Sequence, residues 1–350
     1  MPTTRHGLPK LDLSCVCCPP RRRVLAGLAA IGVSALAPAM PAIAQAPAKP
    51  RRIDLHHHFT PPAYAELGGR GTAADSWSVE KSLADMDAAG ITTSIHSNAG
   101  TDLGGGEKAR RLARAANEFA AKLSADYPGR FGSFATLPMP DLDGSLAEIA
   151  YAFDTLKADG VYLWTSYAGK YLGDPAFDPL YEELNRRKAV IFVHPVRSAC
   201  CGNVASGVPP AAIEYGTDTT RAIARTVFAG TAHKYPDMKI VWSHAGGTMP
   251  FLIERFLFEM RQQEHQNDVP EGFVAAVSKF YYDTAQVTHK IPMTALKMLV
   301  PMSQIVFGSD FPYRTSAEHV QGLKGSGVFD AAELAAIDWQ NAARLLPRWA

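Results

Sequence analysis

The hydrophobic positions of the chain after Pro50 fall into two alternating patterns. Short apolar runs of strand length are separated by longer segments in which apolar residues recur three and four positions apart, as on one face of a helix. The segments 107–128, 178–188 and 219–236 show this helical spacing clearly, and the first and last of them stop at a proline. We expect strands at 53–57, 91–97, 131–137, 160–165, 189–194, 238–244, 280–284 and 304–309.

This alternation continues to the C-terminus without a shift in composition and without a linker rich in Ser or Pro. Eight β-runs alternating with helices predict an α/β protein with a single (β/α)8 TIM barrel over residues 53–350. Such barrels carry their functional residues at the C-terminal mouth of the strands. A doubly wound parallel sheet is the alternative fold class.

The first 52 residues do not share this pattern and look like a targeting segment. Arg21 opens a run of three arginines, a mildly apolar stretch follows, and Ala42-Ile43-Ala44 offers a small-residue cleavage site. Prolines interrupt the stretch, so it is a poor membrane-spanning helix. It resembles a twin-arginine signal. We therefore expect a cleavable signal peptide over 1–44, a linker over 45–52, and a periplasmic or exported protein without membrane contact after cleavage. An uncleaved anchor is the alternative.

Composition narrows the class of partner. The 350 residues are 47% hydrophobic, and 35 Lys and Arg stand against 34 Asp and Glu without a long run of either sign. This balance argues against a nucleic-acid partner and favours an enzyme that acts on a small molecule. Three of the five cysteines lie in the leader, and we expect the adjacent Cys200 and Cys201 to be thiols rather than a vicinal disulfide.

Three consecutive histidines stand in the first predicted strand, within "RRIDLHHHFTPP" at 51–62. Because successive side chains of a strand face opposite ways, His56 and His58 share the inner face and can bind one metal ion. His57 then faces the surrounding helices. The same alternation places Asp54 on the face of His56 and His58, lower in the barrel, where it would support them.

Three further strands end in residues of the same chemical type. "AVIFVHP" ends in His194, "KIVWSHAGG" in His244 and "QIVFGSDFP" in Asp310, each where a β-run breaks into Pro or Gly. A single strand-end His is usually structural, and a single Asp before Phe-Pro is usually a helix cap. Ligand types at four strand ends of one barrel indicate a metal enzyme, and imidazole with carboxylate suits Zn²⁺ or another divalent first-row ion.

The motifs D-x-H-x-H, V-H-P, S-H-A-G-G and F-G-S-D-F-P resemble the amidohydrolase superfamily. The chain is most similar to amidohydrolase family 2, in the branch of aminocarboxymuconate-semialdehyde decarboxylase, from about residue 53 to 346. "GVYLWTSYAG" at the end of the fourth strand has no Lys to bridge two ions, so one ion is expected, Zn²⁺ first and Mn²⁺ as the alternative. The resemblance implies four metal ligands: His56, His58, His194 and Asp310. His244 would stand beside the metal as general base or electrostatic partner.

This resemblance implies non-oxidative decarboxylation of a hydroxylated aromatic or unsaturated carboxylic acid, with the proton supplied by Asp310 or by a metal-bound water that His244 helps. Hydrolysis of a lactone, amide or ester by the same residues is the alternative. A binding protein that kept the barrel and lost its chemistry should lack a ligand, and none is missing. The expected partner is a small carboxylic acid, and the family often forms homodimers.

Several weaker candidates lie near the predicted mouth. His96 ends the second strand and is expected to be structural, the alternative being a place at the pocket mouth. Arg70, in the first loop, is a candidate partner for a substrate carboxylate, as a loop arginine is in the decarboxylases. Trp164, Tyr167 and Phe311 are candidates for an aromatic wall, and plain packing is the alternative. Arg221 and Asp218 are expected to cap and brace the helix after the fifth strand.

Overall fold

The computed structural model describes residues 51–68, 73–98, 102–197, 207–261 and 268–350. The predicted signal peptide, Arg70, Cys200 and Cys201 lie outside these residues, so the expectations about them stay predictions. Residues 49–350 form one compact unit.

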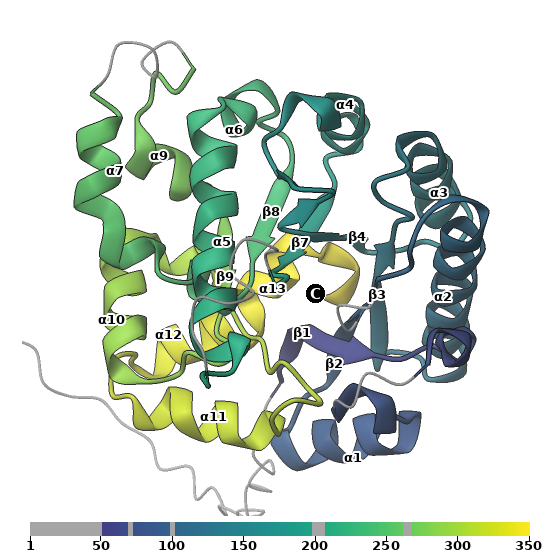
Figure 1. The fold of residues 1–350 in the computed structure, drawn as a ribbon. Coiled ribbons are helices and arrows are strands. Elements are labelled where there is room, and N and C mark those ends of the chain that lie inside the picture. The colour runs from purple at the N-terminus through teal and green to yellow at the C-terminus, as the bar shows by residue number, and fades with distance from the viewer. Residues whose placement is uncertain (1–50, 69–72, 99–101, 198–206, 262–267) are drawn as a thin grey trace, which may run out of the picture. The chain divides into compact units, whose positions relative to one another are not determined.

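Eight parallel strands follow one another in sequence order around a barrel (Figure 1). They are β1 (Ile53–Phe59), β2 (Thr93–Asn98), β3 (Phe131–Thr136), β4 (Gly160–Trp164), β7 (Val190–His194), β8 (Lys239–Trp242), β9 (Tyr281–Asp283) and β10 (Ile305–Val306). The ring closes through backbone hydrogen bonds from Leu55 N to Phe307 O (3.0 Å) and from His58 N to Phe311 O (2.8 Å). The predicted TIM barrel is thus confirmed. A two-stranded hairpin, β5 (Ser166–Tyr167) with β6 (Lys170–Tyr171), projects after β4.

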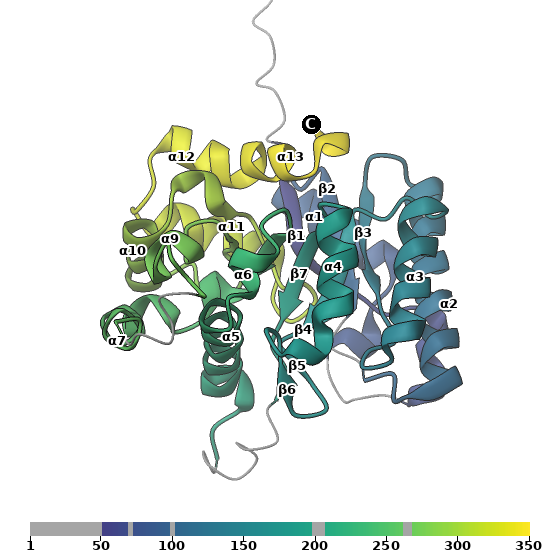
Figure 2. The same ribbon diagram turned by 90° about the horizontal axis from the view of Figure 1, so that it is seen from above.

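Helices surround the strands (Figure 2). They are α1 (Val79–Ala89), α2 (Gly106–Asp126), α3 (Leu142–Asp154), α4 (Asp178–Arg186), α5 (Pro210–Phe228), α6 (Thr231–Lys234), α7 (Ile253–Glu259), α9 (Phe273–Val277), α10 (Lys290–Leu299), α11 (Ser316–Gly325), α12 (Ala331–Ala335) and α13 (Asn341–Leu345). The helix expected over 219–236 begins earlier and is interrupted at Gly230, whose φ of 68° is left-handed. Among the described helices none combines the length and the apolar character needed to cross a bilayer.

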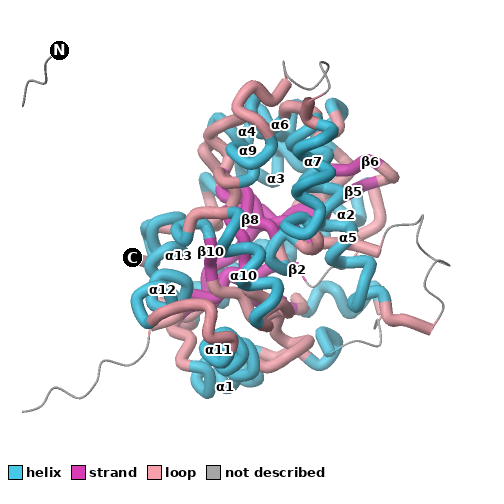
Figure 3. Tube along the Cα trace, turned by 90° about the vertical axis from the view of Figure 1, so that its left-hand side faces the viewer, coloured by secondary structure: helices cyan, strands magenta, loops and turns pink. Residues whose placement is uncertain are grey.

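The first and last β/α units are neighbours. Helix α11 packs beside α1, as Figures 1 and 3 both show. Helix α13 covers the N-terminal end of the barrel, where Ala342 and Leu345 join the apolar cluster that contains Ile53. This arrangement brings the loop that follows β10 next to β1.

Two apolar layers hold the unit together. One lies between the strands and the helices and includes Met86, Ile149 and Ile223; the other fills the barrel interior and includes Phe134 and Phe192. The ring of Phe192 lies 4.9 Å from that of His56 and supports it from below. Because side chains fill the interior, only the mouth of the strands remains for chemistry.

Candidate metal centre

The side chains of the three consecutive histidines point in the predicted directions, but the side chain of Asp54 does not. The imidazole of His57 points toward α1 and lies 2.6 Å from Ser82 Oγ through its Nε2. Asp54 lies beside His57, with 3.1 Å between Oδ2 and Nδ1, so its predicted place beneath His56 and His58 is wrong. The cause is a shift in the β1–β2 register between Asp54 and His57, which breaks the strict alternation of side chains. Asp54 instead supports the backbone, because its Oδ1 accepts the N–H of His56 at 3.0 Å.

Four of the predicted residues converge at the mouth of the barrel. The ligand atoms of His56, His58, His194 and Asp310 all lie within 4.8 Å of one another, and all four residues are buried. The Nε2 atoms of His56 and His58 are 3.1 Å apart, and they lie 3.1 and 3.0 Å from Asp310 Oδ1. Three imidazoles and one carboxylate around a common point fit a single divalent ion of the first transition row or zinc.

The Nδ1 atom of each converging imidazole is held by an oxygen. The pairs are His56 with Asp283 Oδ2 (2.7 Å), His58 with the Asn98 carbonyl (3.0 Å) and His194 with the Pro195 carbonyl (2.9 Å). These oxygens are acceptors, so each Nδ1 carries a hydrogen and each Nε2 faces the common point, where a metal ion would take the place of any proton on that nitrogen. The orientation needed for metal binding is therefore built into the surrounding structure.

Asp283 is a functional residue that the sequence reasoning missed. It ends β9, its Oδ2 holds His56, and its Oδ1 accepts the backbone N–H of His244 (2.8 Å) and Ala285 (3.0 Å). One buried carboxylate thus connects a predicted ligand with the predicted catalytic histidine. The signal was present, because Asp283 stands near the end of a predicted strand just as Asp310 does.

The electrostatics of the cluster favour a bound cation. Burial by itself lowers the pKa of His56, but Asp283 and Asp310 on either side raise it to about 10. Burial raises the pKa of Asp310, yet the charge of His56 and the hydrogen bonds of His244, His56 and His58 hold it well below its usual value. Burial, followed by the neighbouring histidines, keeps the pKa of His194 low, so that its imidazole is in the neutral form that binds metals.

His244 stands next to the four converging residues. Its Nε2 lies 3.5 Å from Asp310 Oδ2, the oxygen that also accepts a hydrogen bond from Gln286 Nε2 at 2.9 Å. The backbones of His244 and Asp310 are left-handed, with φ of 53° and 59°. Such conformations cost free energy in residues other than glycine. Backbone hydrogen bonds stabilise both conformations: the N–H of His244 donates to Asp283 Oδ1, and the N–H of Asp310 donates to the His56 carbonyl, each at 2.8 Å.

Comparison with known proteins agrees with this geometry. A family model described as amidohydrolase matches residues 53–348. The chain belongs to the amidohydrolase family. The decarboxylase yanB of Aspergillus niger is 38% identical over 324 residues, which cover 85% of this chain and 88% of that protein. The 6-methylsalicylic acid decarboxylase of Penicillium expansum is 35% identical over 317 residues, covering 85% and 96%.

A solved structure shares the fold of this amidohydrolase. It is a dihydroxybenzoic acid decarboxylase from a Polaromonas species with bound manganese and the inhibitor 2-nitroresorcinol. The two match with a TM-score of 0.75 over 85% of this chain and 96% of that one, at 21% identity.

Of the weaker candidates, His96, Trp164 and Tyr167 lie outside the group of four converging residues. His96 is buried behind the barrel between the rings of Phe59 (5.1 Å) and Phe131 (4.5 Å), and burial holds its pKa well below the usual value. It is structural, as expected. Trp164 and Tyr167 stack at 5.7 Å and line a small cavity at the ends of β2, β3 and β4.

Asp218 braces the mouth as well as its helix. From α5 its carboxylate accepts hydrogen bonds from Thr165, from Tyr171 OH (2.6 Å) and from Val196 N (3.1 Å). It therefore ties the segment after β4 to the segment after His194.

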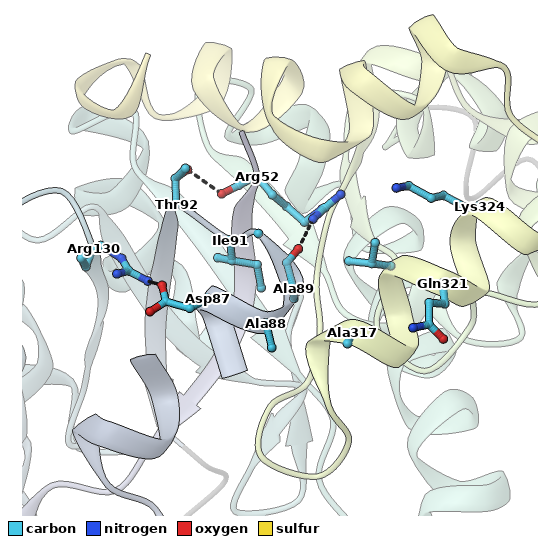
Figure 4. Close-up of a pocket in the computed structure, with 12 residues that line it drawn as sticks. Arg52, Asp87, Ala88, Ala89, Ile91, Thr92, Arg130, Ala317, Gln321 and Lys324 are labelled. Atoms are coloured by element: carbon cyan, nitrogen blue, oxygen red, sulfur yellow. Dashed lines mark hydrogen bonds and ion pairs between the residues drawn. The ribbon is translucent and has the colours of Figure 1, made fainter. Parts of the chain in front are cut away.

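A cavity of about 920 Å³ opens elsewhere on the described part of the chain (Figure 4). It is lined by residues at the N-terminal ends of β1, β2 and β3 and by α11. Its arginines are already paired, Arg52 with Asp338 at 2.8 Å and Arg130 with Asp87 at 2.7 Å. Barrel enzymes build their active sites at the opposite end of the strands, so we assign the chemistry to the metal centre.

Proposed function

We propose that this amidohydrolase is a metal-dependent, non-oxidative decarboxylase of a hydroxylated aromatic carboxylic acid. The observation that carries the proposal is the convergence of His56, His58, His194 and Asp310, with His244 beside them, in a chain whose relatives are decarboxylases. The relative from Penicillium expansum acts, by its name, on 6-methylsalicylic acid. A hydroxybenzoic acid is therefore the class of substrate to test first.

The donor set suits Zn²⁺, and Mn²⁺ is the alternative because the Polaromonas structure contains manganese. When bound, the ion would polarise the oxygens of the substrate and stabilise negative charge that develops as carbon dioxide leaves. His56, His58, His194 and Asp310 would hold it.

In the reaction, the bond between the ring carbon and the carboxylate carbon breaks. Carbon dioxide leaves, its former bonding electron pair stays on the ring carbon, and a proton joins that carbon. Asp310 is a predicted metal ligand, and its carboxylate lies within reach of a neighbouring imidazole. We assign the proton to His244, because its Nε2 lies 3.5 Å from Asp310 Oδ2. His244 is thus the proton donor and Asp310 its electrostatic partner.

The wall of the mouth favours an aromatic substrate. Tyr162, Trp164 and Met139 line the cavity beside the centre, and the ring of Tyr162 lies 6.3 Å from that of His194. Trp164 Nε1 donates to Tyr162 OH at 3.1 Å, which fixes both rings. A flat ring packs well against such side chains at the mouth, although the cavity itself, of about 20 Å³, is too small to enclose one.

The test is carbon dioxide release by the purified, metal-loaded protein with a panel of hydroxybenzoates, including 6-methylsalicylate, and muconate-type acids. We expect release from a hydroxybenzoate, its loss after chelator treatment and its recovery when the metal is restored. Hydrolysis of a lactone, amide or ester would use the same residues. If no acid releases carbon dioxide while a lactone or ester is cleaved by the metal-loaded protein, the proposal is wrong and the hydrolase is right.

Two further proposals concern the whole chain. The leader would direct folded protein to the periplasm, and replacing the arginine run from Arg21 to Arg23 by lysines should leave it in the cytoplasmic fraction. The amidohydrolase resemblance also suggests a homodimer, which light scattering of the purified protein would detect.

A further inference from the structure

The segment that follows Asp310 lies across the mouth of the barrel. Tyr313 N donates to the Asp310 carbonyl at 3.0 Å, which closes a tight turn. The turn places the ring of Tyr313 edge-on to that of His58, with 5.7 Å between the centroids. Arg314 is the next residue and has a side chain that is 47% exposed, so a cation stands at the rim of the metal centre.

Gln286 connects this cation with the centre. Its Nε2 donates to Asp310 Oδ2 at 2.9 Å, while its Oε1 lies 3.5 Å from Arg314 Nη1. The backbone of Gln286 is left-handed, with φ of 62°, and its N–H donates to His319 Nε2 at 3.0 Å. One fixed amide group therefore separates the guanidinium from the carboxylate of a predicted metal ligand.

Among the described residues, the charge of Arg314 is poorly compensated. Its ion pair is with Glu318 Oε1, and the closest nitrogen and oxygen are 3.9 Å apart. The other oxygen of that carboxylate is engaged elsewhere, because Glu318 Oε2 accepts from Thr315 N (3.0 Å) and Thr315 Oγ1 (2.9 Å) in a capping box. Arg187, by contrast, binds Asp154 and Glu183 at 2.7 and 2.6 Å. Arg314 thus keeps donors available for an anion.

From this geometry we propose that Arg314 is a specificity-determining residue that binds the carboxylate of the substrate at the rim of the metal centre. A guanidinium matches a carboxylate through two parallel N–H donors, whereas Lys offers only a point charge. Because decarboxylation removes the carboxylate, Arg314 contacts the acid and not the phenol product. Its binding free energy is therefore spent on capturing the acid, so that losing Arg314 should raise KM without lowering kcat.

This proposal rests on the proposed function, and the experiment separates the two. The metal-loaded protein and its Arg314→Gln variant are compared in carbon dioxide release and in calorimetric binding of 2,6-dihydroxybenzoate and of resorcinol. We expect KM for the acid accepted in the panel assay, and Kd for 2,6-dihydroxybenzoate, to rise about tenfold, the effect of one charged hydrogen bond. Affinity for resorcinol should change less than twofold, and kcat should not fall. Arg314→Lys should recover part of the loss.

Lys324→Gln is the matched control, because it removes one positive charge on α11 at the opposite end of the barrel (Figure 4). It should leave every one of these constants unchanged. Equal weakening of acid and phenol in Arg314→Gln, or an unchanged KM, would overturn the role of Arg314. A wild-type protein that carries metal but releases no carbon dioxide would instead count against the decarboxylase itself.

Discussion

Replacing Asp283 by Asn should weaken metal binding although Asp283 is not a ligand. Its Oδ1 accepts two backbone N–H groups, from His244 and Ala285, and its Oδ2 accepts Nδ1–H of His56 at 2.7 Å. An amide in the same place keeps its oxygen toward the two backbone donors, which turns its NH₂ toward His56. Nδ1 must then accept a hydrogen bond, and the ring hydrogen moves to Nε2, where it blocks the metal-binding lone pair.

Loss of such an oxygen partner typically lowers metal affinity about 10- to 100-fold, which corresponds to about 1.4 to 2.7 kcal/mol. The upper end is expected here, because both side chains are fully buried and water cannot take over the interaction. The measurement is competition for Zn²⁺ or Mn²⁺ with a chromophoric chelator at fixed pH.

Asp54→Asn provides a matched control within the same protein. Asp54 Oδ1 also accepts two backbone N–H groups, from His56 (3.0 Å) and Ser309 (3.1 Å), and its Oδ2 also holds a histidine. That histidine is His57, which faces the helices. Asp54→Asn should therefore lower stability and leave metal affinity within a few-fold of wild type. If Asp283→Asn binds metal as tightly as wild type, or if both variants lose metal affinity equally, Asp283 does not act by fixing which ring nitrogen of His56 carries the hydrogen.

Other consequences can be checked with standard assays. His58→Ala should lose bound metal and activity while His57→Ala keeps the metal, as measured by elemental analysis. Phe192→Ala, beneath His56, should cost about 3–5 kcal/mol of unfolding free energy in denaturant titrations. Burial raises the pKa of Asp159 from 3.8 to about 6, so the folded state holds this proton more tightly than the unfolded state. Its contribution to stability is present below about pH 4 and is lost as pH rises through 6; Asp159→Asn should remove this trend from melting temperatures.

The barrel and the convergence at its mouth followed from local sequence, and the support around the centre did not. The residues of the centre each lie at or next to the end of an apolar run; they are His56, His58, His194, His244 and Asp310. Once the runs form parallel strands of one barrel, these residues meet at the same end of it. The side of the strand on which Asp54 lies depends instead on pairing between β1 and β2, which no local pattern encodes.

The role of Gln286 was equally hidden from the sequence. It lies on an exposed turn, and its significance comes from a 2.9 Å contact with a residue 24 positions away. Polar residues on turns are common, so its type carries no signal. Only the placement of Asp310 beside that turn distinguishes Gln286 from other surface amides.

The seam where the barrel closes also determines when the metal centre can exist. His58 lies in β1 and Asp310 follows β10, and the two residues are separated by 252 positions in the chain. Contacts over such a separation carry a large loop-closure cost and form late in folding. An ion bound by residues on both sides of this closure would cross-link the first and last strands and slow the opening of the barrel. Metal loading should therefore lengthen the lifetime of the folded state more than it changes the rate at which the chain folds.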